Sequence, residues 1–176
     1  DGFSSYIEGI PEIKQEDDEL EIPRDISVET WVSLGAYPWN WAPILTIGKY
    51  KVTGFYFGID SRGRAGFHMS DATSVWHECT SKLNPNTKAG MELNKWYHID
   101  AIINIFEGEM TLYIDNKLIT TGSILQKESD KSSSPILIGK NMSTNFNGII
   151  DDIRIYNRII NNSEVHCWYY EKNWKS

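Results

Sequence analysis

The chain has 176 residues, of which 40% are hydrophobic and 23% charged, and it carries a formal net charge of −7 with a pI near 5.1. This length fits one domain, so we expect residues 1–176 to form a single domain. The acidic balance disfavours nucleic acid and anionic membranes as partners, and no run approaches the ~20 apolar residues of a membrane span. The first residues lack an initiator Met and a signal peptide, so we expect a domain excised from a larger protein.

Short segments with a period of two follow one another along the chain. Strands are predicted at residues 26–34, 55–59, 65–69, 75–81, 96–105, 110–114, 117–120, 136–139 and 149–156. Turn residues at 60–63 and 115–116 join strands into two hairpins. Residues 162–170 are expected to form one short helical turn, capped by Ser163 and packed back through Val165 and Trp168. The dominant strand period predicts an all-β fold, built as a two-sheet antiparallel sandwich or jelly roll.

Alternation along these strands also assigns their faces. In the strand at 26–34, one face carries Val28, Thr30 and Val32, and the other carries Ser27, Glu29, Trp31 and Ser33. If Cys79 lies in the core, Trp76, Glu78 and Thr80 share the opposite face. On the neighbouring hairpin the predicted core residues are Phe55, Phe57, Phe67 and Met69. The residues predicted to point outward are Tyr56, Arg64 and His68.

Three tryptophans are candidates for a carbohydrate site. Trp39 and Trp41 flank one residue in the loop AYPWNWAP, and Trp76 is predicted to face outward. The apolar face of a sugar ring stacks on an indole while its hydroxyls stay available for hydrogen bonds. Trp76 would line a groove together with Tyr56, Arg64, His68 and Glu78. Such a groove would offer aromatic rings, hydrogen-bond donors and a carboxylate to a sugar. The alternatives are that one loop tryptophan plugs the end of the sandwich and that the strand face is an ordinary solvated one.

Catalytic patterns are missing from the sequence. Glycoside hydrolysis uses a rigid pair of carboxylates, and no strand carries one; Glu107-Gly108-Glu109 is typical of a turn. A Gly-x-Ser-x-Gly elbow and zinc-type histidine spacing are also absent. We therefore expect no enzyme activity. Cys79 and Cys167 could form one disulfide or remain as two buried free thiols.

The C-terminal third resembles a known family. Residues 146–158, FNGIIDDIRIYNR, are similar to the closing strand of the laminin-G-like jelly rolls in the concanavalin A-like superfamily. Further segments follow the same order, namely Asp1-Gly2 with Tyr6-Ile7, residues 28–32, and residues 96–98 followed by 112–116. The resemblance spans nearly the whole chain and implies the concanavalin A-like, laminin-G-like sandwich. The segments 39–44, 54–60 and 76–79 resemble modules of bacterial polysaccharide hydrolases, among which the fructan-binding module of levanase-type enzymes is the nearest.

These resemblances imply a non-catalytic, lectin-like carbohydrate-binding module that targets an attached glycoside hydrolase to a polysaccharide, with a fructan as the named candidate. The alternative is a calcium-dependent protein-interaction or adhesion domain of laminin-G type. We expect an extracellular, cell-surface or periplasmic monomer that binds a polysaccharide or oligosaccharide and does not insert into membranes.

A structural Ca²⁺ is a second expectation. The resemblance implies a metal ligand at Asp151, because family members often use the matching aspartate for a structural metal. Ca²⁺ prefers several oxygen ligands. Pairing of the first and last strands would bring Asp1, Gly2 and Ser4 near Asp151 and complete such a site. The alternative is that Asp151 accepts backbone or arginine hydrogen bonds instead.

Overall fold

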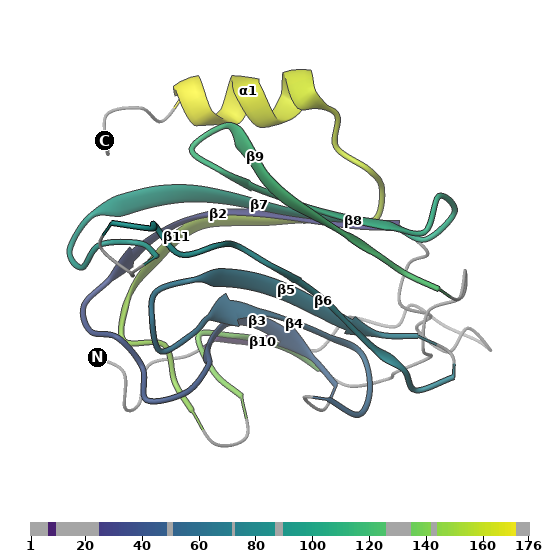
Figure 1. Cartoon of the computed structure of the whole chain (residues 1–176), viewed down its shortest axis with the longest axis horizontal. Helices are drawn as coiled ribbons and strands as arrows, with labels where there is room; N and C mark the ends of the chain where they lie inside the picture. Colours follow the sequence, from purple (N-terminus) through teal and green to yellow (C-terminus); the bar gives the residue numbers. More distant parts are fainter. Residues whose placement is uncertain are drawn as a thin grey trace.

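The computed structural model describes residues 7–9, 25–48, 51–71, 73–86, 90–125, 135–141 and 144–171, the first of these segments through its backbone. In these residues, eleven strands form two antiparallel sheets that pack face to face, and a helix lies on the outer side of one sheet (Figure 1). The all-β jelly-roll sandwich predicted from the sequence is confirmed.

One sheet has six strands in the order β1-β10-β3-β4-β5-β6. Their bounds are β1 Ile7–Gly9, β3 Ala42–Ile47, β4 Phe55–Ile59, β5 Ala65–Ser70, β6 Trp76–Thr80 and β10 Ile136–Ile138. Strand β3 was not predicted, because Pro43 and the two tryptophans before it are typical of a loop. It nevertheless lies in the middle of the sheet, with a register shift between Pro43 and Leu45. A bulge of this kind accommodates a proline, which cannot donate to the ladder.

The second sheet has five strands in the order β11-β2-β7-β8-β9. Their bounds are β2 Asp25–Leu34, β7 Trp96–Asn104, β8 Glu109–Ile114, β9 Lys117–Ser123 and β11 Gly148–Tyr156. The predicted hairpin turn joins β8 to β9, where Asp115 and Asn116 have φ values of 50° and 59°. Two successive positive φ values match the twist that a two-residue hairpin needs.

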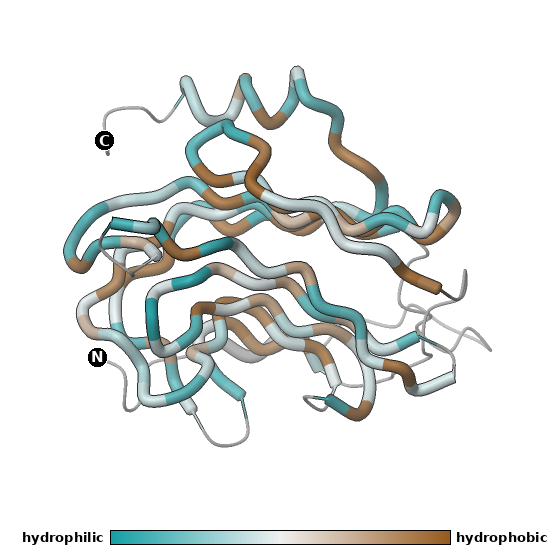
Figure 2. Tube along the Cα trace, viewed as in Figure 1, coloured by the Kyte–Doolittle hydropathy of each residue, from teal (hydrophilic) through white to brown (hydrophobic). Residues whose placement is uncertain are grey.

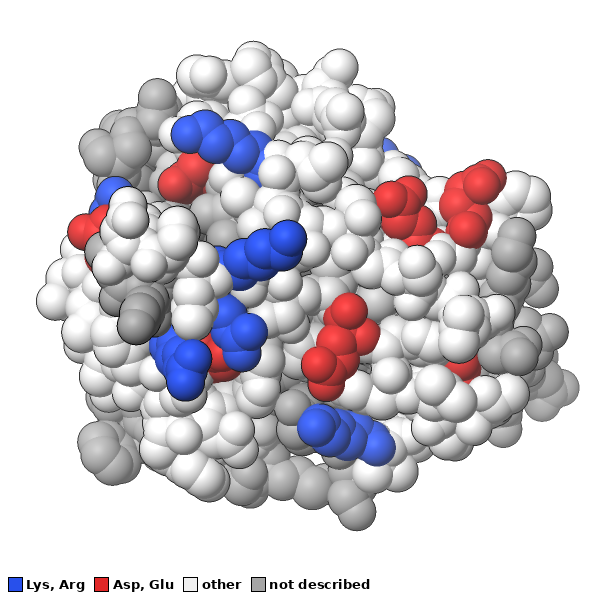
Figure 3. Space-filling view, in the orientation of Figure 1, with Lys and Arg blue, Asp and Glu red and all other residues white. Residues whose placement is uncertain are grey.

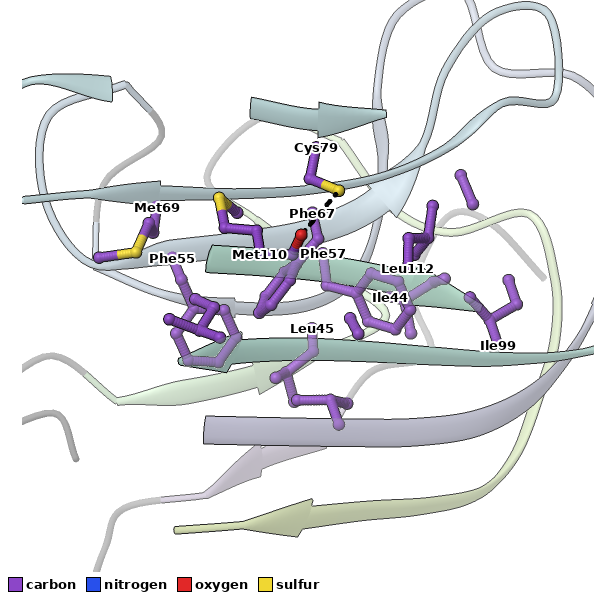
Figure 4. Packing of buried hydrophobic residues seen from close by; sticks show 14 of the residues in the cluster. Ile44, Leu45, Phe55, Phe57, Phe67, Met69, Cys79, Ile99, Met110 and Leu112 are labelled. Atoms are coloured by element: carbon purple, nitrogen blue, oxygen red, sulfur yellow. Dashed lines mark hydrogen bonds between the residues drawn. The ribbon is translucent and has the colours of Figure 1, made fainter. Parts of the chain in front are cut away.

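The core fills the space between the sheets. Phe55, Phe57, Phe67, Met69 and Cys79 all lie in it, as the alternation predicts, and Figure 4 shows them facing residues of the other sheet. Hydrophobic and hydrophilic residues alternate along the strands, which leaves one side of each strand for the core (Figure 2).

The two cysteines are both free. Cys79 is buried, and its thiol contacts the carbonyl oxygens of Met110 at 3.8 Å and Thr120 at 3.7 Å. Burial, with a smaller contribution from Glu109, raises the pKa of this thiol to about 11. Cys167 is exposed on the helix. The alternative of a disulfide is excluded by this arrangement, and of the two thiols only Cys79 is buried.

The C-terminal helix is longer than the single turn predicted, and its N-cap is a different residue. Helix α1, Asn162–Glu171, covers the outer face of the five-stranded sheet (Figure 1). Its cap is Asn161 rather than Ser163, since the Asn161 Oδ1 accepts the backbone N–H groups of Ser163 at 2.9 Å and Glu164 at 3.1 Å. Val165 is buried and Trp168 stacks on the Arg154 guanidinium at 3.5 Å, so the predicted packing is confirmed. No helix in the described part of the chain has the length and apolarity to cross a membrane.

Candidate functional site

An aromatic row crosses the outer face of the six-stranded sheet. The strand register places Tyr56 on β4 opposite His68 on β5, and His68 opposite Glu78 on β6. The Tyr56 and His68 rings are stacked with centroids 6.2 Å apart, and the His68 and Trp76 rings lie 5.8 Å apart. The structure therefore brings together the strand residues that the sequence assigned to one face.

Trp41 joins this row from the loop before β3. Its ring meets the His68 ring edge-on at 4.6 Å and the Tyr56 ring at 6.4 Å. Space for the indole comes from Gly66 on β5, which pairs with Gly58 on β4. A Cβ atom on Gly66 would lie 2.5 Å from the Trp41 ring. Trp41 thus packs on the outer face of the sheet and is half-buried there, rather than plugging the end of the sandwich.

The predicted groove is corrected by the burial of two of its members. Tyr56 is 1% exposed and His68 is 0% exposed, so neither can line an open groove. His68 Nε2 lies 3.2 Å from the Thr80 hydroxyl. Burial, assisted by Lys51, lowers the pKa of His68 to about 4, which keeps its imidazole neutral at physiological pH. Alternation assigned the correct face to these side chains but could not show that the face is covered.

Trp76 and Glu78 keep part of their predicted accessibility. Trp76 is half-buried and Glu78 is exposed, and both lie on the edge strand β6. The third outward residue, Arg64, is partly exposed, and its Nε donates to the Asp60 Oδ2 at 2.6 Å. The residues that stay accessible therefore lie along the edge and at one end of the sheet.

Three segments joined by hydrogen bonds lie together at one end of the sandwich, on the left side of Figure 1. We call this region the loop end; it comprises residues 35–41, 60–64, and 81–86 with 90–95. The hydrogen bonds that join them are Tyr37 Oη to Met91 O at 2.9 Å, Gly90 N to Arg62 O at 2.7 Å and Met91 N to Gly63 O at 2.8 Å. Asp60 Oδ1 also accepts the backbone N–H groups of Arg62 and Arg64. These bonds fix the loops to one another, so their side chains have a defined arrangement.

Trp39 stands out at the loop end with 81% of its surface exposed. Tyr37, in the same loop, is 39% exposed, although its hydroxyl is bound to Met91. Arg62 is exposed on the adjoining turn, beside Arg64. The loop end therefore carries an exposed ring and, on the turn that contacts Tyr37 at Gly63, two guanidinium groups, so it offers both a stacking surface and hydrogen-bond donors, the combination that a sugar requires. Trp39 and Arg64 were predicted from the sequence as site residues, whereas Tyr37 and Arg62 were not. Their positions in a loop and in a turn, where binding residues are frequent, could have indicated them.

A pocket of about 270 Å³ opens beside the loop end, between the edges of the two sheets. Its lining residues are Ser81, Lys82, Leu83, Asn84, Gly90, Met91, Tyr97, Ile114 and Ile119. Apolar side chains dominate this lining, and its residues from Ser81 to Asn84, with Gly90 and Met91, belong to the loop end. The pocket could hold a small apolar group next to the more polar surface around Trp39.

Two carboxylates that the structure describes lie on or beside the six-stranded sheet, the exposed Glu78 on β6 and the buried Asp60 at the loop end. Glu78 faces His68 across the strand ladder, and both Asp60 oxygens accept hydrogen bonds. Glu29 and Asp100 lie close together on the helix-covered face of the other sheet, where they are 1% and 0% exposed. A polysaccharide cannot reach them there.

The calcium site stays a prediction. Asp1, Gly2 and Ser4 lie outside the described residues. Asp151 is exposed at the irregular part of β11, and its Oδ1 accepts the Asp152 backbone N–H at 2.8 Å, in line with the hydrogen-bonding alternative. The expected pairing of first and last strands was wrong for the part described, because β1 pairs with β10 whereas β11 pairs with β2.

On the face shown in Figure 3, Lys and Arg side chains gather mainly on the left, with Asp and Glu among them, and Asp and Glu predominate on the right.

Solved structures with the same arrangement of strands include the receptor binding domain of botulinum neurotoxin D, with 19% sequence identity, a TM-score of 0.69, and coverage of 89% of this chain and 40% of that chain. The botulinum neurotoxin DC binding domain in complex with SialylT has 19% identity, a TM-score of 0.67, and coverage of 85% and 36%. The botulinum neurotoxin serotype G binding domain has 22% identity, a TM-score of 0.65, and coverage of 86% and 37%. At these identities the likeness shows the fold, and this chain spans about two fifths of each longer chain.

No curated protein sequence matches this chain. The sequence profile of the concanavalin A-like lectin/glucanases superfamily, in contrast, matches residues 10–166, which is most of the chain. Together with the two-sheet jelly roll, this match shows that the chain belongs to the concanavalin A-like lectin/glucanases superfamily.

Proposed function

We propose that this domain is a non-catalytic carbohydrate-binding module that targets an attached glycoside hydrolase to a polysaccharide outside the cell, and that it acts as a monomer. The observation that carries the proposal is Trp39, 81% exposed on a loop whose neighbours are fixed by hydrogen bonds. Transfer of apolar ring surface from water into an apolar contact is favourable, and a stacked sugar ring would remove the indole surface from water.

The surroundings of Trp39 support a sugar rather than an apolar ligand. Arg64 is oriented by its 2.6 Å contact with Asp60, and Arg62 is exposed on the same turn. Guanidinium groups held in place can donate to sugar hydroxyls without a further loss of side-chain entropy. Glu78 on the nearby edge strand adds an acceptor. We expect Arg64 and Glu78 to select among sugars through these contacts.

The expected affinity is modest. One or two stacked rings and a few exposed hydrogen bonds compete with water and with ordering costs, which gives a Kd of ~10 µM to 1 mM. Such affinity suits a targeting module, since it concentrates an attached enzyme on an insoluble substrate while permitting exchange. The non-catalytic part of the proposal is supported by the burial of Glu29 and Asp100.

A glycan array probed with the purified domain tests the proposal, with polymeric and oligomeric fructans included among the glycans. Matched variants are Trp39→Ala and Phe106→Ala. Phe106 is 74% exposed on the turn after β7, at the opposite end of the sandwich from the loop end, so it controls for a general effect of exposed rings. We expect at least one glycan to bind to the wild type and to Phe106→Ala, and to lose binding to Trp39→Ala.

Three results would contradict parts of this proposal. Binding to protein ligands in a calcium-dependent manner, with no glycan bound, would favour the laminin-G-type adhesion alternative. Release of reducing sugar by the purified domain would show that it is catalytic. Binding only to glycans other than fructans would support a carbohydrate-binding module but exclude a fructan as its target.

A further inference from the structure

Beneath helix α1, three chemically active side chains meet on the outer face of the five-stranded sheet. Glu29 on β2 lies directly opposite Asp100 on β7, and His98 lies two residues before Asp100 on the same strand face. One ligand atom of each lies within 4.8 Å of the other two. The helix closes over them through Tyr169, whose ring is stacked on Trp31 at 5.9 Å and lies 6.0 Å from the His98 ring.

The cluster is buried, and several of its polar atoms have no hydrogen-bond partner. Glu29, His98 and Asp100 are 1%, 2% and 0% exposed. Glu29 Oε2 and Asp100 Oδ1 have no hydrogen-bond partner, and the remaining two atoms, His98 Nδ1 and Asp100 Oδ2, have only each other, at a long 3.3 Å. Buried polar atoms without partners are costly. Their convergence on one point indicates that a group belonging there would supply the missing interactions.

The charges of the cluster are also unbalanced. Glu29 and Asp100 are paired across the two strands, and carboxylates placed opposite each other in this way repel when both are ionised. Arg154 Nη1 donates to Glu29 Oε1 at 2.8 Å, and the Tyr156 hydroxyl donates to the same oxygen at 2.9 Å. These two contacts orient the Glu29 carboxylate and leave its Oε2 available, but neither reaches Asp100.

From this geometry we infer that Glu29 Oε2, His98 Nδ1 and an Asp100 carboxylate oxygen bind a divalent transition-metal ion of the zinc type. His98 Nδ1 and Asp100 Oδ2 are 3.3 Å apart. Ligand atoms held ~2.0–2.1 Å from a tetrahedral zinc ion lie about 3.3–3.4 Å from each other, so these two atoms already have the spacing of a ligand pair. An imidazole nitrogen with two carboxylates suits zinc better than Ca²⁺, which prefers oxygen.

The metal would have a structural role. It would link β2 to β7 below the helix, in a position that a polysaccharide cannot reach, and a water molecule would complete its coordination. This site is separate from the loop end and from Asp151, so it stands whether or not the domain binds carbohydrate.

The test uses the whole domain, treated with a chelator, dialysed, and then exposed to Zn²⁺ alone. Elemental analysis after a second dialysis should find about one zinc ion per chain, and zinc should raise the melting temperature by several degrees. Co²⁺ in place of zinc should give visible absorption bands. The control is His166→Ala, which removes an exposed histidine of helix α1 and should leave zinc uptake unchanged.

Asp100→Asn distinguishes a metal site from a simple buried ion pair. If the metal site is correct, the variant takes up no zinc, and its metal-free form melts at or above the temperature of the metal-free wild type because the repulsion with Glu29 is gone. If Asp100 is instead paired with a protonated His98, the wild type takes up no zinc and Asp100→Asn melts lower. Absence of zinc and of cobalt bands in the folded wild type would overturn the inference.

Discussion

The indole of Trp41 lies directly over Gly66, so that a Cβ atom added to the glycine would stand 2.5 Å from Cη2 and 2.8 Å from Cζ3 of the ring. The contact links the loop end to the middle of the six-stranded sheet, since Trp41 belongs to the segment that carries Trp39. Thr144 strengthens the link by donating its hydroxyl hydrogen to the Trp41 carbonyl at 3.1 Å. Gly66 therefore helps to determine where the exposed Trp39 is presented.

Gly66→Ala should force Trp41 off the sheet. Overpacking of this kind costs about 1–3 kcal/mol, and the displaced loop should also bind glycan more weakly. Urea unfolding measures the first effect and a glycan titration measures the second. In a Trp41→Ala background the same glycine substitution should cost clearly less, because the ring is gone and the 2.9 Å approach to His68 Nε2 remains. Equal costs in both backgrounds would show that the Trp41 contact is not what excludes a side chain at position 66.

Asn161→Ala should destabilise the domain by about 1 kcal/mol, the usual effect of removing a helix N-cap. Asn161 Oδ1 accepts two backbone N–H groups, and Asn161 N donates to Glu164 Oε2 at 2.9 Å. Ser163→Ala is the matched control, two residues further along, and should change the free energy of unfolding by less than about 0.5 kcal/mol. A larger effect at Ser163 than at Asn161, measured by urea unfolding, would contradict the assignment of the cap.

Asp71 should give the domain an acid-sensitive component of stability. Burial alone would raise the pKa of Asp71, but hydrogen bonds from His77 and Thr73 and from the Val75 backbone outweigh it and lower this pKa to about 2, from an ordinary value of 3.8. Because this pKa is lower in the folded state than in the unfolded chain, ionised Asp71 contributes about 2 kcal/mol to the free energy of unfolding above pH ~4. This contribution is lost as the pH falls toward 2.

The comparison with Asp71→Asn isolates this component from the other carboxylates. His77 Nε2 lies 2.8 Å from Asp71 Oδ2, and both side chains are buried. Unfolding free energies measured from pH 7 to pH 2 should show the variant less stable at neutral pH and the two proteins converging in acid. A difference that stays constant over the whole range would show that ionisation of Asp71 does not contribute.

Strand alternation was sufficient to place most side chains on the correct face. It assigned Phe57 and Cys79 to the core and Tyr56 and His68 to the opposite face, because the period of two is a property of the backbone. It could not predict that Tyr56 and His68 are buried. That result depends in part on Trp41, which reaches across the sheet to Gly66 from a segment distant in sequence.

The buried carboxylates were missed for a related reason. Glu29 and Asp100 lie on a strand face that alternation treats as solvent-exposed, and only the packing of α1 on that face removes them from water. The sequence predicted one helical turn at this point, too short to cover the sheet. The exposure of Trp39, in contrast, follows from its place in a loop bordered by Pro38, and the sequence was enough to nominate it.

Calorimetric titration of the best glycan from an array determines whether the domain binds carbohydrate through Trp39 at the loop end. We expect a Kd of ~10 µM to 1 mM for the wild type and for Phe106→Ala. Trp39→Ala should weaken binding at least ~10-fold, corresponding to 1.4 kcal/mol, with an unchanged melting temperature because the ring is 81% exposed. Equal affinities for the wild type and Trp39→Ala would show that the Trp39 ring is not part of a carbohydrate site.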